Sequence, residues 1–138
     1  MVKQLLNLNK NSAQADFSWL PKLEKIIIKK FHLKKQISIA LIDDQAIRKL
    51  NRVYRKKDKT TDVLSFVIND NYILGEVLIS VQQARRQAKS KNNSYKSEFQ
   101  LLTVHGILHL LGYDHEKSPK EARLQEQTEK QILDELNK

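Results

Sequence analysis

The sequence contains no cysteine, and it contains no long run of apolar residues. Without cysteine, disulfide bonds and thiolate metal ligands are excluded, and the composition fits a reducing compartment. No segment approaches the roughly 18 apolar residues that a membrane span needs. The first ten residues also lack the apolar core and cleavage site of a signal peptide. We therefore expect a soluble protein of the cytoplasm with no membrane partner.

The 138 residues predict a single domain over 1–138. Alternating and helical apolar patterns predict the order β, α, β, α, β, β, α, α, α. The fold class expected is therefore α+β (mixed α/β), with about four strands in a mixed sheet packed by five helices. We expect strands at about 2–8, 36–42, 63–68 and 73–79, and helices starting near 16–18, 43–44, 80, 95 and 118.

Acidic residues are few relative to basic ones, at 16 against 25, which gives a net charge of +9. A solvated, lysine-rich surface would explain such a balance, and so would a nucleic-acid partner. The placement of the charges favours nucleic acid, because seven basic residues fall within 48–59 and only Asp58 is acidic there.

Three of the four histidines lie in one stretch, 105–115. His105 and His109 are four residues apart, which places both imidazoles on one face of a helix. Gly112 can end that helix in a left-handed conformation and so bring His115 to the same point. Three imidazoles with a fourth position free are the ligand set of a catalytic zinc site. Isolated histidines packed in a core are the alternative, but burying their unpaired nitrogens would cost free energy.

The spacing of these histidines is that of metzincin-type metalloproteases, which carry glutamate as a general base directly after the first histidine. Here that position is Gly106. Peptide hydrolysis by that route is therefore not expected.

Two segments resemble the YbeY family of bacterial metal-dependent endoribonucleases. One is 105–115, and the other is 50–66 followed by Leu74-Gly75-Glu76. The chain departs from the family pattern at Thr60 and Val67, where proline is usual. The resemblance implies a metzincin-like metal-site core and a role in ribosomal RNA maturation and ribosome quality control. It also implies zinc ligands and a functional arginine, which are His105, His109, His115 and Arg55 in this sequence.

Our hypothesis is zinc-dependent hydrolysis of phosphodiesters in single-stranded RNA, in maturation of the 16S ribosomal RNA 3′ end. Zinc would lower the pKa of a water molecule, and Arg55 would bind phosphate oxygens. Flanking phosphates would be bound, without sequence readout, by Arg52, Lys56, Lys57 and Lys59. The proton acceptor stays open between Asp114, Glu98 and Glu121, and Asp114 is alternatively an orienting partner of an imidazole. Asp62 and Ser65 are expected to be structural.

Two other functions stay open at this point. A metallopeptidase-like hydrolase would need a carboxylate from elsewhere in the chain and would not use the basic segment, 48–59. A non-catalytic, ribosome-associated factor would hold a structural zinc whose fourth position is filled by protein. The ribosome or ribosomal RNA is the expected partner, and the pattern does not predict an oligomeric state.

Overall fold

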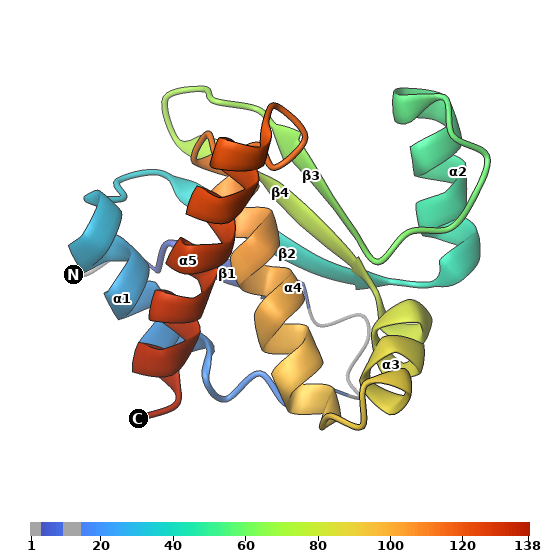
Figure 1. The fold of residues 1–138 in the computed structure, drawn as a ribbon. Helices are drawn as coiled ribbons and strands as arrows, with labels where there is room; N and C mark the ends of the chain where they lie inside the picture. The colour runs from blue at the N-terminus through green and yellow to red at the C-terminus, as the bar shows by residue number, and fades with distance from the viewer. Residues whose placement is uncertain (1–3, 10–14) are drawn as a thin grey trace.

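The computed structural model describes residues 4–9 and 15–138, which form four strands and five helices in the predicted order (Figure 1). The expected α+β class is confirmed. The elements are β1 (Leu6–Asn9), α1 (Leu20–Phe31), β2 (Gln36–Ile42), α2 (Asp44–Arg55), β3 (Val63–Val67), β4 (Ile73–Ser80), α3 (Val81–Ser90), α4 (Tyr95–Leu110) and α5 (Pro119–Leu136). Residues 2 and 3 of the predicted first strand lie outside the described residues.

The four strands form one mixed sheet in the order β1-β2-β4-β3. β1 pairs with β2 and β2 with β4 in parallel, whereas β3 pairs with β4 antiparallel through the short connection 68–72. β3 is therefore an edge strand, and within 4–9 and 15–138 no strand lies along the other side of its main chain.

Helices cover the two faces of the sheet unequally. The larger core lies between the sheet and α1, α4 and α5, where side chains such as Ile27, Ile107 and Ile132 are buried. On the opposite face only α2 packs, through Ile47 against Leu64 and Leu78. Figure 1 shows α2 standing apart from the group of α1, α4 and α5. The arrangement leaves the edge strand β3 between α2 and α4.

Side-chain oxygens cap the N-termini of most of the helices, near the starts that the sequence predicts. Asp43, Ser80 and Ser118 accept hydrogen bonds from the first turns of α2, α3 and α5. The predicted start of α1 near Asp16 or Ser18 is wrong by two to four residues. Asp16 accepts the Ser18 N–H in a local turn, and the helix begins at Leu20. No helix in 4–9 or 15–138 is long and apolar enough to cross a membrane.

Candidate metal and RNA site

The C-terminal half of α4 carries two of the three predicted imidazoles on one face. His105 and His109 lie one turn apart, and both are half-buried. Gly112 follows the helix with φ of 105°, a backbone conformation that residues other than glycine rarely adopt. The chain then turns back, so that the ring of His115 lies 5.2 Å from that of His105 and 6.2 Å from that of His109, centroid to centroid. The predicted convergence of the three imidazoles is thus present.

Two of the imidazoles are held by hydrogen bonds at Nδ1. His109 Nδ1 donates to the Tyr113 carbonyl at 2.9 Å, and His105 Nδ1 donates to the carboxylate of Glu129 on α5. The hydrogen bond that His105 donates to Glu129 raises the pKa of His105, although burial of the ring opposes the increase. With Nδ1 engaged, Nε2 is the nitrogen left for a metal ion. Glu129 was missed in the sequence because it lies 24 residues from His105, with no spacing that links them.

In the described residues, one group of possible ligand atoms comes from His109, Asp114 and His115, all within 4.8 Å of one another. His105 lies outside this limit, although its ring neighbours that of His115. His109, Asp114 and His115 form a group that can hold a metal ion, and imidazole and carboxylate donors suit zinc. Asp114 bonds to no imidazole in the described residues; its carboxylate accepts the Glu116 N–H at 3.0 Å. The orienting partners are instead Glu129 and the Tyr113 carbonyl.

Gly106 lies where α4 approaches the sheet most closely. A Cβ atom at this position would come within 2.5 Å of Val77 Cγ1 and 3.2 Å of Ser65 Oγ. The Gly106 carbonyl accepts a hydrogen bond from Ser65 Oγ at 2.9 Å, which ties β3 to α4. A glutamate side chain does not fit here without moving the helix. The absence of the peptidase base is thus a property of the packing as well as of the sequence.

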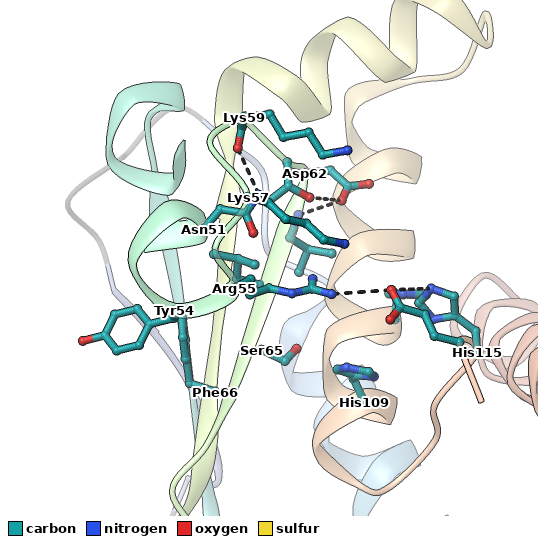
Figure 2. A pocket seen from close by; sticks show the side chains of 15 residues that line it. Asn51, Tyr54, Arg55, Lys57, Lys59, Asp62, Ser65, Phe66, His109 and His115 are labelled. Carbon is teal, nitrogen blue, oxygen red and sulfur yellow. Dashed lines mark hydrogen bonds and ion pairs between the residues drawn. The ribbon is translucent and has the colours of Figure 1, made fainter. Parts of the chain in front are cut away.

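A cleft of about 750 Å³ joins the three imidazoles to α2, the 56–61 loop and β3 (Figure 2). Arg55, at the end of α2, reaches across this cleft to Glu116, with 3.5 Å between Nη2 and Oε1. Its guanidinium therefore lies near His115, which Glu116 follows in sequence. Asp58, the one acidic residue within 48–59, pairs with Arg48.

The structure separates the four predicted RNA-binding residues into two pairs. Lys57 and Lys59 line the cleft, whereas Arg52 and Lys56 are exposed and do not. The cause is the end of α2: Lys56 takes a left-handed conformation with φ of 58°, and the chain after it turns toward β3. Basic residues that are neighbours in sequence are therefore divided between the cleft lining and exposed positions outside it.

None of the three carboxylates considered as proton acceptors, Asp114, Glu98 and Glu121, is part of the cleft lining. Glu98 is buried between α3 and α4, where Lys91 and Gln87 bond to its oxygens. Glu121 belongs to the first turn of α5, where its N–H donates to Ser118 Oγ. By contrast, Asp62 lines the cleft.

Thr60 and Val67 occupy the positions where proline was expected from the family resemblance. Thr60 Oγ1 donates to Asp44 at 3.2 Å, so the hydroxyl ties the loop to α2. Val67 ends β3 and is exposed. Neither departure removes a group from the cleft.

The sequence and the fold are similar to those of known proteins. The family model described as Endoribonuclease YbeY matches residues 5–137. A protein named Endoribonuclease YbeY from Aquifex aeolicus is 48% identical over 107 residues, covering 75% of this chain and 71% of that protein. One of the same name from Desulfitobacterium hafniense is 39% identical over 124 residues, covering 78% and 79%.

Among solved structures, the chain is similar to a solution structure of a Thermotoga maritima protein, with 27% identity and a TM-score of 0.71. The similarity covers 95% of this chain and 88% of that one. Fold, family model and relatives together support an endoribonuclease role. The chain belongs to the YbeY family of endoribonucleases.

Proposed function

We propose that this protein is a single-domain, zinc-dependent endoribonuclease that hydrolyses phosphodiester bonds of single-stranded RNA. The observation that carries this proposal is the cleft itself, which joins three imidazoles to the cationic side chains of Arg55, Lys57 and Lys59. A metal site beside cations suits a polyanionic substrate. From the family resemblance we further propose ribosomal RNA as the substrate, in maturation of the 16S 3′ end and ribosome quality control in the cytoplasm.

The residues present fit a zinc ion. His105, His109 and His115 would hold it, and the hydrogen bonds at Nδ1 of the first two leave Nε2 as the donor. When bound, zinc supplies Lewis acidity toward water and phosphate oxygens. The Glu129 carboxylate fixes the ring of His105 and increases its basicity as a ligand.

The cationic side chains would act on the RNA backbone. Arg55 binds non-bridging phosphate oxygens with its forked donors and offsets the charge that grows in the transition state. Its ion pair with Glu116 joins side chains that are 41% and 59% exposed, so the pair is weak and readily exchanged for phosphate. Lys57 and Lys59 bind neighbouring phosphates. Arg52 and Lys56, which are not part of the cleft lining, contribute less to RNA binding.

We propose Asp114 as the carboxylate that accepts the proton from water. One of its oxygens lies within 4.8 Å of ligand atoms of His109 and His115. The same proximity favours a second function, in which Asp114 is a fourth protein ligand and the zinc is structural. The two roles differ in what Asp114→Asn does. As the proton acceptor, Asp114 is needed for cleavage but not for zinc affinity. As a ligand of a structural zinc, it is needed for zinc affinity, and the native chain then cleaves no RNA.

The test incubates the purified protein with single-stranded RNA, and separately with unfolded polypeptide, with and without a chelator. We expect cleavage of RNA alone, its loss with chelator and its return on addition of zinc. His109→Ala should abolish cleavage, and Arg55→Ala should slow it about 100-fold, as for loss of one transition-state donor. Asp114→Asn should slow cleavage while zinc affinity is kept.

Matched controls use residues outside the cleft lining. His32→Asn replaces the exposed histidine after α1, and Arg48→Ala replaces an exposed arginine on the same helix as Arg55. Both should cleave as the native chain does. Cleavage that persists in His109→Ala would contradict the zinc proposal, and polypeptide cleavage would favour a peptidase.

A further inference from the structure

The edge strand β3 presents the main-chain groups of alternate residues to its free edge, along which part of the cleft lies. In an antiparallel pair, alternate residues bond to the partner strand and the others face outward. The Ser80 N–H donates to the Asp62 carbonyl at 2.9 Å, and the Ile68 N–H to the Leu74 carbonyl at 3.0 Å. The register between these two pairs is uninterrupted, so even-numbered residues bond to β4. The main-chain groups of Val63, Ser65 and Val67 therefore point to the free edge.

The cleft wraps around this edge. Its lining includes Phe66 and Leu64 from the face of the sheet covered by α2, and Ser65 from the face covered by α4. Figure 2 shows Ser65 below Arg55 and toward the side of the cleft that carries His109. Ser65 thus lines the cleft together with Arg55 and the imidazoles of α4.

Ser65 has the outward N–H that stays available for a ligand in the cleft. The N–H of Val63 already donates to the Asp62 carboxylate at 2.8 Å. Val67 lies beyond the cleft lining. In the residues that the structure describes, no acceptor bonds to the Ser65 N–H. Meanwhile the Ser65 hydroxyl donates to the Gly106 carbonyl at 2.9 Å, which holds this part of β3 against α4. The result is a main-chain donor on a strand segment that is tied to α4 and lines the same cleft as the three imidazoles.

We propose that the Ser65 N–H donates a hydrogen bond to a phosphate oxygen of the RNA in the cleft, and that the edge of β3 is part of the RNA-binding site. This proposal rests on the proposed function. Main-chain N–H groups are common donors to phosphate. Lining the same cleft, Arg55, Lys57 and Lys59 supply the positive potential that draws the phosphate in.

An extended polypeptide is the other ligand that an edge strand can bind. It would need both donors and acceptors along β3, and the Asp62 carboxylate already occupies the Val63 N–H. A phosphate needs only a hydrogen-bond donor and a positive electrostatic potential. The observations therefore favour RNA.

Proline substitution tests the donor directly. Ser65→Pro removes an N–H that makes no bond to β4, and proline is tolerated at such outward positions of edge strands. We expect KM for single-stranded RNA to rise about 10-fold, the effect of losing one hydrogen bond to a charged group. Ser65→Ala removes the hydroxyl alone and measures the loss of the tie to Gly106. Val67→Pro removes an outward N–H beyond the cleft and should leave KM unchanged.

A second measurement does not depend on how Ser65→Pro folds. The amide resonances of the native chain are followed during titration with a short phosphorothioate RNA, and separately with an extended peptide. We expect the Ser65 amide proton to shift with RNA, while the Leu64 and Phe66 amides, which bond to β4, stay in place.

The outcomes separate this inference from the proposed function. If RNA shifts the amides of Lys57 and Lys59 but not that of Ser65, the inference is wrong and the proposed function stands. If RNA shifts none of them, both are wrong. A Ser65 shift produced by the peptide at lower concentration than by RNA would overturn the inference in favour of strand addition.

Discussion

At the scale of the residue, the site depends on how each imidazole is oriented. The three histidines supply nitrogens, but Glu129 and the Tyr113 carbonyl determine which nitrogen of His105 and His109 is left for a metal ion. Such partners tune metal affinity nearly as strongly as the ligands themselves. Among the residues that are not ligands, Glu129 is therefore the one whose substitution should lower zinc affinity most.

We predict that Glu129→Gln weakens zinc binding by about 10- to 100-fold, because the amide is a weaker acceptor for the His105 N–H. Zinc affinity is measured by competition with a chelator at alkaline pH, where protons do not compete for the imidazole. Glu126→Gln makes the same change of charge at an exposed position of α5 and should bind zinc as the native chain does. Equal affinity in the two variants would contradict the role of Glu129.

At the scale of the element, Asp44 joins three segments that build the wall of the cleft opposite α4. It lies in the first turn of α2 and accepts hydrogen bonds from Ser80 Oγ at 2.7 Å and Thr60 Oγ1 at 3.2 Å. Arg86 of α3 pairs with it at 2.8 Å. One carboxylate thus holds the end of β4, the 56–61 loop and the start of α2 in a common arrangement.

These contacts predict sensitivity to acid. Burial alone would raise the pKa of Asp44, but the hydrogen bonds from Ser80, Arg86 and Thr60 together outweigh it and lower the pKa from its ordinary 3.8. A carboxyl whose pKa is lowered by folding stabilises the folded state above its unfolded pKa. The contribution of Asp44 should be fully present above about pH 3.8 and be lost as the pH falls through the lower folded value.

We predict that Asp44→Asn lowers the free energy of unfolding at neutral pH by about 1–3 kcal/mol, from lost hydrogen bonds to a charged group. The difference from the native chain should shrink below pH 3.8, which denaturant titrations at several pH values would measure. Asp58→Asn, which removes an exposed partner of Arg48, should cost less than about 1 kcal/mol. A difference for Asp44→Asn that is the same at every pH would contradict the assigned pKa.

At the scale of the whole molecule, the net charge of +9 acts through where the charges lie. Counterion release makes RNA affinity fall with salt, by about 0.7 in the logarithmic slope for each phosphate contact on a single strand. Three cations of the basic segment, Arg55, Lys57 and Lys59, line the cleft. A slope near −2 follows from these three contacts.

We predict that the double variant Lys57→Gln/Lys59→Gln weakens RNA binding and makes the salt slope shallower by about 1.4, from two lost contacts. The double variant Arg52→Gln/Lys56→Gln removes the same charge from exposed positions outside the cleft lining, and should change the slope little. RNA affinity measured over a range of salt concentrations compares the two. Equal effects would mean that net charge, and not the cleft, governs binding.

Much of the fold follows from local patterns. The strand 36–42 and the caps at Ser80 and Ser118 were predicted correctly, because apolar alternation and capping act between residues close in sequence. The start of α1 was not, because the turn at Asp16 competes with the helix for the same N–H groups. Strand order and the position of β3 at the edge are decided by contacts between distant segments, which local patterns do not contain.

The sequence by itself determined the three imidazoles, their spacing on a helix and the glycine turn that brings His115 back, because each depends on residues within one eleven-residue stretch. Only the tertiary structure decided what surrounds them. Glu129 comes from α5, Arg55 from α2 and the Ser65 main chain from an edge strand. These groups meet because packing of the sheet against α4, closest at Gly106, brings together segments far apart in the chain.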